Sequence, residues 1–303
     1  MELEFKPVVA GDIDRLRPFY GLRPNKTCDS VFLDSFLWKD YYHVQCAVSE
    51  GRAVLWLMEK DGQVSTAMPL CREEDLPYFF QQMVDYFSGV LHKPFYISLA
   101  DEEAVQCLNL DPALFEVEEQ LDLKDYLYSG EELRKLEGKK FVKKRNHLNG
   151  FKRTYEGRYE YRRLCCSDRH EVWQFMERWR QHKEEVGAME LSLDYEVAGI
   201  HDILKNCSSL YVRMAGVYID GQLEAFTIGS LNVRENMAVI HIEKANPEIR
   251  GLYQFINQQF LINEFPEAEL VNREDDVGME GLRKAKMSYC PIGFARKYMV
   301  RER

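Results

Sequence analysis

Hydrophobic and polar positions follow two different periods along the chain, and together they predict a mixed α+β protein. Short apolar runs at 44–49, 52–58 and 63–70 are typical of β-strands, and "PFYISL" and "LKDYLY" add two more. Apolar residues recur at helical spacing over 73–91. A helix is therefore expected to follow the first three strands.

The second half of the chain repeats this order. Helical patterns at 131–155 and 168–185 precede strand patterns at 210–217, 222–231 and 236–244, and a helical pattern follows at 251–265.

Each half also carries an Asp-Gly-Gln tripeptide between two apolar runs, at 61–63 and 220–222. Asp-Gly is a strong hairpin signal, because both central residues of the turn need φ > 0. The matching hairpins indicate a duplicated unit, and two Asp-Gly hairpins that arise by chance are the alternative.

The order of helix, antiparallel meander, helix and strand resembles the N-acetyltransferase superfamily. The expected fold is two tandem GNAT-like (acyl-CoA N-acyltransferase-like) domains, each a mostly antiparallel mixed sheet flanked by helices. The expected boundary gives an N-terminal domain of 1–128 and a C-terminal domain of 129–303, with the active site in the second. A chain of 303 residues has the length for two domains.

Composition excludes several classes of protein. A hydrophobic fraction of 46% excludes disorder, and a net charge of −10 argues against a surface that is basic all over. The eight cysteines include no Cys-x-x-Cys, which predicts reduced thiols rather than a disulfide framework or a zinc site. No signal peptide and no apolar run of about 20 residues is present, which predicts a cytoplasmic protein without a transmembrane segment.

One strongly basic stretch, 139–163, stands out in this acidic chain, with ten Lys/Arg against two Glu. On a helix its lysines and His147 share a face that suits phosphate contacts, with three nearby tyrosines available to stack bases. A solvated helix edge is the plain alternative. The predicted nucleic-acid-binding residues are Lys143, Lys144, Arg145, His147 and Lys152.

A second segment, 236–260, joins a strand pattern to a helix start. Strand alternation predicts His241 and Glu243 on one face and Lys244 on the other, although a core histidine is the alternative. In acetyltransferases this junction binds the coenzyme A pyrophosphate through helix N–H groups, usually with Gln/Arg-x-x-Gly-x-Gly/Ala. Tyr253 replaces the last small residue here and crowds a pyrophosphate, so coenzyme A is the less favoured donor.

A third segment, 270–298, contains acidic and basic residues close together in the sequence. The loop carboxylates 274–276 are predicted to recognise the ammonium of an acyl group, and Arg283 and Lys286 to bind a phosphate. Mutual pairing of these charges is the alternative.

These segments carry a resemblance to a bacterial family related to the C-terminal catalytic domain of phosphatidylglycerol lysyltransferases. The residues that carry it are "GKKFVKKRNHLNGF" (138–151), "IHIEKANPEIRGLYQFIN" (240–257) and "VNREDDVGMEGLRKAKMSYCP" (271–291), and it runs over nearly the whole chain. The resemblance implies transfer of an aminoacyl group from a charged tRNA to a lipid hydroxyl. The lysyltransferases carry a multi-span membrane domain that is not seen here, so the acceptor is left as a lipid, a small molecule or a peptide, and peripheral membrane contact stays open.

The predicted function is therefore an aminoacyl-tRNA-dependent acyltransferase. An aminoacyl ester is already activated, so proximity, a base and an electrophile-stabilising donor suffice. Aminoacyl-tRNA is the expected donor and co-substrate, with no metal site and no firmly implied cofactor. An acetyl-CoA-dependent N-acetyltransferase and a non-catalytic RNA- or polyanion-binding module are the alternatives.

The predicted catalytic residues are Glu243, His241 and Arg250. The predicted substrate-binding residues are Lys244, Tyr253, Asn272, Arg273, Asp275, Asp276, Arg283, Lys286 and Tyr289.

Overall fold

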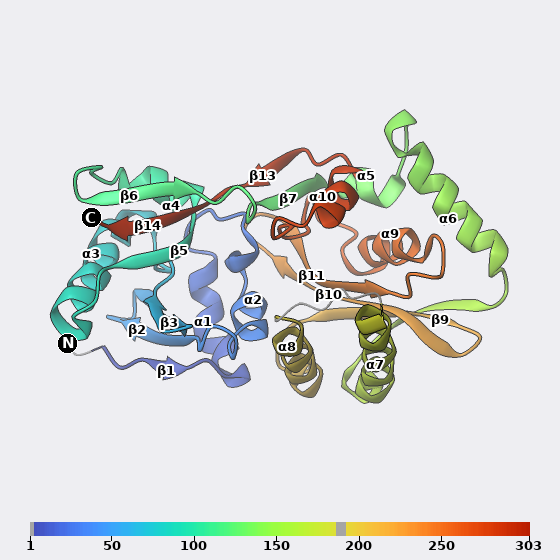
Figure 1. Cartoon of the computed structure of the whole chain (residues 1–303), viewed down its shortest axis with the longest axis horizontal. Coiled ribbons are helices and arrows are strands. Elements are labelled where there is room, and N and C mark those ends of the chain that lie inside the picture. The colour runs from blue at the N-terminus through green and yellow to red at the C-terminus, as the bar shows by residue number, and fades with distance from the viewer. Residues whose placement is uncertain (1–2, 186–191) are drawn as a thin grey trace.

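A computed structural model describes residues 3–185 and 192–303 and shows two lobes side by side (Figure 1). The first lobe holds a sheet of order β1-β2-β3-β4 and a sheet of order β5-β14-β6. Its strands are β1 (Lys6–Pro7), β2 (Gln45–Ser49), β3 (Ala53–Lys60), β4 (Gln63–Ser65), β5 (Tyr96–Asp101), β6 (Phe115–Glu119) and β14 (Lys297–Glu302). Its helices are α1 (Ile13–Tyr20), α2 (Phe32–Leu37), α3 (Leu76–Tyr86) and α4 (Glu102–Leu108).

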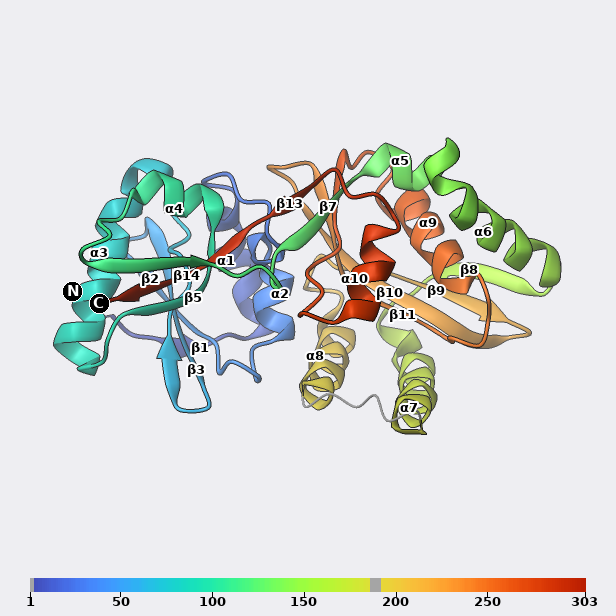
Figure 2. The same cartoon turned by 45° about the horizontal axis from the view of Figure 1, so that its top comes forward.

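The second lobe is built on one seven-stranded sheet of order β13-β7-β12-β11-β10-β9-β8. Helices α7 and α8 cover one face of this sheet, and α9 with α5 and α6 lies on the other (Figure 2). Its strands are β7 (Asp125–Ser129), β8 (Tyr159–Arg163), β9 (Arg213–Ile219), β10 (Gln222–Asn232), β11 (Met237–Ala245), β12 (Leu270–Asn272) and β13 (Gly293–Ala295). Its helices are α5 (Gly130–Lys135), α6 (Val142–Thr154), α7 (Arg169–Glu185), α8 (Leu193–Asn206), α9 (Leu252–Glu264) and α10 (Glu280–Met287).

Both predicted Asp-Gly hairpins are confirmed. Asp61 and Gly62 have φ of 51° and 79°, and Asp220 and Gly221 have φ of 50° and 82°. The flanking residues pair directly across two-residue turns that join β3 to β4 and β9 to β10. Positive φ at both central positions is the geometry for which Asp-Gly is favoured.

The helix expected over 131–155 is interrupted, and the structure divides it into α5 and α6. Leu136 and Gly138 both have positive φ, which ends α5. The Arg145 guanidinium donates hydrogen bonds to the carbonyl oxygens of these two residues. Arg145, predicted to bind nucleic acid, therefore holds the turn between α5 and α6.

The chain crosses between the lobes at both ends of the second unit. Strand β7 pairs with β12 and β13 of the large sheet, whereas the final strand β14 returns to pair with β5 and β6 (Figure 1). The domain boundary near residue 129 stays a prediction. The return of β14 means that the two lobes are tied together by more than one connection.

The two lobes also share a hydrophobic core. One cluster joins side chains of α1, α2, β2 and β3 to side chains of α7, α8, β10 and β11. Gly199 of α8 packs so closely on α2 that a Cβ there would lie 2.2 Å from the carbonyl oxygen of Leu37. Because the Leu37 carbonyl oxygen occupies the space that a side chain at position 199 would need, only glycine fits there.

The structure corrects the expectation that all cysteines are free thiols. Cys166, before α7, and Cys207, after α8, form a disulfide across a sequence separation of 41 residues. The antiparallel pairing of α7 and α8 brings these distant positions together, which spacing alone could not reveal. Among the described residues, no helix is both long and apolar enough to cross a bilayer.

Candidate active site between β11 and β12

The candidate site lies where two parallel strands of the large sheet separate. β11 and β12 pair only over Met237–Val239 and Leu270–Asn272. β11 continues to Ala245, but the chain after Asn272 leaves the sheet as the loop 273–279. Beyond Val239 and Asn272 the two strands therefore part, and this divergence is here called the opening.

A β-bulge at His241 alters the side-chain alternation on β11. Ile228 pairs with Ile242 and Gly229 with Ile240, so His241 is the extra residue. As a result Ile240 packs in the core under α9, whereas Ile242 packs in the core shared with α7 and α8. The expectation that strict alternation holds through 240–244 is wrong for this reason.

The bulge places His241 and Glu243 in different surroundings. Glu243 binds Asn257 of α9, while His241 binds Ser230 through Nε2 at 2.8 Å and Glu274 through Nδ1 at 2.9 Å. Burial lowers the pKa of His241 to about 3, so the imidazole is neutral and its contact with Glu274 is a hydrogen bond rather than an ion pair. His241 is thus buried, and its partners are Ser230 and Glu274 rather than Glu243 or Arg273.

Glu243 and Arg273 form the centre of the opening. The Arg273 Nη2 donates to Glu243 Oε1 at 2.8 Å, and the Asn257 Nδ2 donates to Oε2 at 2.8 Å. The Arg273 Nη1 is buried and has no hydrogen-bond partner, while the guanidinium lies 4.8 Å from the Tyr289 ring centre. A fixed guanidinium with an unused N–H is able to bind an anionic oxygen.

Lys144 of α6 reaches the same opening. Its Nζ lies 3.8 Å from the Tyr289 ring centre and donates to Ser288 Oγ at 2.5 Å. Burial, followed by the positive charge of Arg273, lowers the pKa of Lys144 to about 8. A residue predicted to bind nucleic acid thus meets two residues predicted to bind substrate, Arg273 and Tyr289.

The other predicted basic residues lie along α6. Lys143 is exposed, Lys152 lies 5.9 Å from the Phe255 ring centre, and His147 accepts from Arg250 at 3.3 Å. The stretch 139–154 carries seven Lys/Arg and no acidic residue. The basic face of α6 therefore runs from Lys144 at the opening outward to solvent.

Gly251 has a packing role at the start of α9. Its φ is +89°, and a Cβ there would lie 2.3 Å from the carbonyl oxygen of His147. The glycine thus allows α9 to touch the backbone of α6. Arg250 beside it is exposed, and Tyr253 is largely buried, which raises its pKa. The motif reading could not distinguish this helix contact from a close approach to a ligand.

Most charges of the third segment pair with one another. Arg283 binds both oxygens of Asp276 at 2.8 Å, and also Asp122. The Arg283 hydrogen bonds, with those of Tyr126 and Gly278, hold the pKa of Asp276 far below its usual range. For Asp276 and Arg283, mutual pairing accounts for the observed contacts.

Two further residues of this segment shape the loop. Lys286 is buried and donates to the carbonyl oxygens of Arg273 and Asp275. Asn272 is fully buried and donates to the carbonyl oxygen of Lys26 at 2.8 Å. Their contacts fix the backbone that carries Arg273 into the opening.

Comparison with known proteins assigns the chain to a family. A profile described as "Phosphatidylglycerol lysyltransferase, C-terminal" matches residues 21–301. The chain belongs to this family. A conserved protein of unknown function from Bacteroides thetaiotaomicron is 27% identical, with a TM-score of 0.90 and full coverage of both chains.

More distant structures show the fold alone. The C-terminal domain of a putative lysylphosphatidylglycerol synthetase from Agrobacterium fabrum is 17% identical, with a TM-score of 0.69 over 96% of this chain and 91% of that one. A tandem GNAT protein from the clavulanic acid biosynthesis pathway is 10% identical, with a TM-score of 0.50 over 100% and 98%. These likenesses confirm the predicted tandem GNAT-like fold.

A curated relative is uncharacterised. The protein MYCGA3080 of Mycoplasmoides gallisepticum is 28% identical over 178 residues, which is 58% of this chain and 56% of that protein. The match therefore spans about half of the relative's length.

The remaining predicted substrate residues lie beyond the opening in this family member. Lys244 points to the other face of the sheet, where its Nζ lies 2.7 Å from Glu196 and 4.0 Å from the Trp179 ring centre. Asp275 lies 3.7 Å from Lys297, and burial raises its pKa. Neither residue contacts Glu243 or Arg273 in the described hydrogen bonds and ion pairs.

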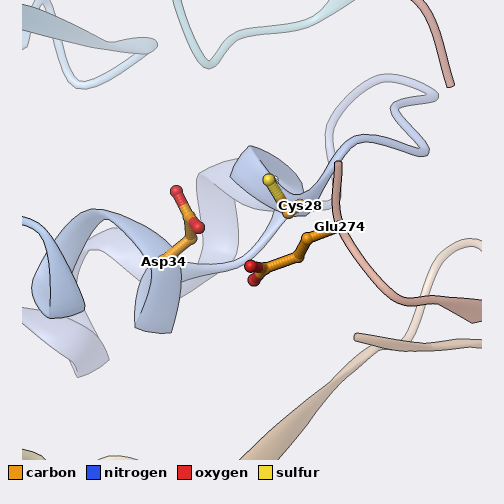
Figure 3. A group of neighbouring side chains, drawn as sticks. All are labelled: Cys28, Asp34 and Glu274. Carbon is orange, nitrogen blue, oxygen red and sulfur yellow. The ribbon is translucent and has the colours of Figure 1, made fainter. Parts of the chain in front are cut away.

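A buried ionic cluster between the lobes was missed at the level of sequence. The Lys297 Nζ lies 2.7 Å from Asp125 and 3.2 Å from the Cys28 sulfur. The Cys28 sulfur and one carboxylate oxygen each of Asp34 and Glu274, atoms of the kinds that ligate metals, all lie within 4.8 Å of one another (Figure 3). Asp125 in the strand pattern "LKDYLY" was the available signal, because a charge inside a buried strand needs a partner.

Proposed function

We propose that the opening between β11 and β12 is an acyl-transfer site, where an aminoacyl group passes from a charged tRNA to a hydroxyl or amine acceptor. The observation that carries this proposal is the Glu243–Arg273 pair with its unused, buried Nη1. Membership of the lysyltransferase family supports acyl transfer, and the basic face of α6 supports a tRNA donor.

The proposed reaction needs no covalent enzyme intermediate. The acceptor oxygen or nitrogen attacks the carbonyl carbon of the aminoacyl ester, while the Glu243 carboxylate takes its proton. The Arg273 Nη1–H donates to the oxyanion that forms on the carbonyl oxygen. The ester C–O bond then breaks, and the terminal ribose oxygen of the tRNA receives a proton from the Lys144 ammonium. A lysine with a pKa of about 8 is charged at neutral pH and close to the range in which it can give up that proton.

The residue that stabilises the oxyanion differs from the catalytic arginine predicted from the sequence. Arg250 was predicted to be catalytic and Arg283 to bind a phosphate, whereas Arg273 was predicted only to bind substrate. Arg283 is engaged by two carboxylates, and Arg250 is exposed beside His147. Arg273 is buried against the proposed base, which makes it the better oxyanion donor.

Donor binding is tested first, by filter-binding titrations with charged and uncharged bulk tRNA at stated moderate salt. Calorimetry with coenzyme A and acetyl-CoA runs in parallel. Saturable binding that favours charged tRNA, without coenzyme A binding, supports the proposal. Tight coenzyme A binding without tRNA binding overturns it and makes the basic face of α6 a surface feature.

The proposed base is tested by Glu243→Gln. We expect transfer from labelled aminoacyl-tRNA to fall by about 100-fold or more, with tRNA affinity unchanged, because the amide keeps the shape but cannot take a proton. Glu248→Gln is the matched control, since Glu248 is exposed at the end of the same segment. Full transfer activity in Glu243→Gln would remove the residue from its assigned role.

A further inference from the structure

A cavity in the first lobe lies apart from the proposed transfer site. It has a volume of about 90 Å³ and is lined by the aromatic side chains of Trp38, Tyr42 and Trp56, with the carboxyl groups of Asp29 and Asp34. A cavity of about 150 Å³ holds a benzene molecule, so this one has room for roughly four non-hydrogen atoms. The lining also includes Arg23 and Asp101, which form a buried ion pair with each other at 2.6 Å, so Asp29 and Asp34 are the lining acids outside that pair.

Asp34 lacks a cationic partner. Its residue is only 8% exposed, yet among the described side chains no lysine, arginine or histidine nitrogen lies within ion-pair distance of its carboxyl group. Its side-chain hydrogen-bond partner is Asp29, a second acid. Burial, and then the charges of Asp29 and Glu274, raise the pKa of Asp34 well above its usual value. Asp29 is 41% exposed and lies 3.7 Å from the Lys297 ammonium, so Asp34 is the acid without a cation in ion-pair distance. The desolvation of Asp34 is offset either by a proton or by the positive charge of a ligand.

The surrounding charges are also unbalanced. Five carboxyl groups influence one another here, those of Asp29, Asp34, Asp125, Glu274 and Asp275. The two ammonium groups among them belong to the lysines at 286 and 297, and the nearby histidine at 241 is neutral. The cluster therefore holds more carboxyl groups than ammonium groups.

We propose that this cavity binds an organic ammonium group, with Asp34 and Asp29 as its counter-charges and the aromatic rings of Trp38, Tyr42 and Trp56 as its walls. Aromatic faces attract cations, and they do so most strongly where water is excluded. A metal ion fits less well, because the Lys297 ammonium already lies 3.2 Å from the Cys28 sulfur of the Cys28, Asp34 and Glu274 group (Figure 3). Binding of an ammonium group does not depend on the proposed transfer reaction, but the two natural sources named below rest on it.

The cavity is also connected to the proposed transfer site by two residues that are adjacent in the sequence. Glu274, in the group with Asp34, directly follows Arg273, the proposed oxyanion donor. Two ligands share the required chemistry, namely the α-ammonium of an aminoacyl group and the amine of an acceptor. The experiment below separates these two sources.

The test measures binding of propylammonium and tetramethylammonium by calorimetry and by tryptophan fluorescence, with propan-1-ol as the uncharged control. We expect saturable binding of the ammonium probes. Asp34→Asn should weaken it about tenfold or more, and Asp40→Asn, an exposed acid outside the cavity, should leave it unchanged. Asp34→Asn should also keep or raise the melting temperature, because it removes a buried ionisable group whose pKa is raised by desolvation. Trp38→Leu is a second variant, expected to weaken tetramethylammonium binding by loss of the aromatic wall.

Two results would overturn the proposal. One is the absence of saturable binding of every ammonium probe, or equal binding by Asp34→Asn. The other is zinc binding that Asp34→Asn abolishes while the ammonium probes do not bind, which assigns a metal site instead.

If the probes bind, filter binding with Asp34→Asn identifies the source. Weaker binding of charged but not of uncharged tRNA supports the aminoacyl ammonium, and unchanged tRNA binding supports the acceptor amine. Glu243→Gln should bind the probes normally, so failure of the transfer proposal remains distinguishable from failure of this one.

Discussion

Replacing Lys297 with methionine should destabilise the protein strongly, because this lysine supplies positive charge to a buried site between the lobes. Lys297 is 1% exposed and its Nζ lies 2.7 Å from Asp125, which is fully buried. Burial alone lowers the pKa of Lys297, but the charge of Asp125, followed by those of Cys28, Asp29 and Asp275, raises it well above its usual value. Because a raised lysine pKa stabilises the folded state below the pKa of the unfolded chain, the whole contribution is present at neutral pH.

The magnitude follows from what remains after the substitution. Removing one partner of a buried ion pair costs about 3–5 kcal/mol, since the other charge stays buried. Asp125 would keep two hydrogen bonds to its Oδ2, from the Cys28 N–H at 2.6 Å and the Asn272 amide at 3.0 Å. We therefore expect a loss of about 3 kcal/mol, the lower end of that range, which is a large share of a typical stability of about 5–15 kcal/mol.

The assay is urea unfolding of Lys297→Met, Asp125→Asn and the double variant. The double variant should recover part of the loss, because no buried charge is left without a partner. The deficit of Lys297→Met should also shrink as pH falls, since a proton neutralises the orphaned carboxylate. Lys284→Met is the control, because Lys284 and Glu280 are 80% and 85% exposed and should change stability by less than about 0.5 kcal/mol. A loss below about 1 kcal/mol in Lys297→Met, with no recovery in the double variant, would refute the reasoning.

Three further predictions concern single positions. Gly251→Ala should lower the free energy of unfolding by about 1–3 kcal/mol, because its φ is +89° and a Cβ would collide with α6. Gly150→Ala within α6 is the control, since its Cβ meets no atoms and the change should stabilise the protein by about 0.5–1 kcal/mol. Equal effects of the two substitutions in urea unfolding would contradict this prediction. Reducing the Cys166–Cys207 disulfide should lower stability by about 4 kcal/mol on the loop-entropy model, and an unchanged urea midpoint with reductant would show that the two are thiols in solution. Charged-tRNA affinity should decline as pH rises through about 8 and Lys144 loses its proton, and Lys144→Met should remove that pH dependence; a pH profile unchanged by the substitution would exclude this role.

Local patterns in the sequence determined many of the elements of this protein. The Asp-Gly turns at 61–62 and 220–221 were read correctly, because the φ > 0 requirement is a property of the two turn residues alone. The predicted helices over 73–91, 168–185 and 251–265, and the central strands of both lobes, were found for the same reason, since their periodicity depends on neighbours along the chain. The three motif segments also led to the family and to Glu243, Arg273, Lys144 and Tyr289.

Tertiary structure decided what those residues do. The bulge at His241 depends on the register between β10 and β11, and it separated His241 from Glu243. The pairing of Arg283 with Asp122, the return of β14 to the first lobe and the disulfide at Cys166 all join residues that are far apart in the sequence.

The buried ionisable residues show most clearly what a local sequence pattern cannot predict. No local sequence pattern predicts the energetic roles of Asp34 and Lys297. Those roles come from desolvation and from the charges of residues that only folding brings near. Sequence fixes the periodicity of each element through interactions between near neighbours. Which charges are paired, and which await a ligand, depends on long-range packing that no local pattern records.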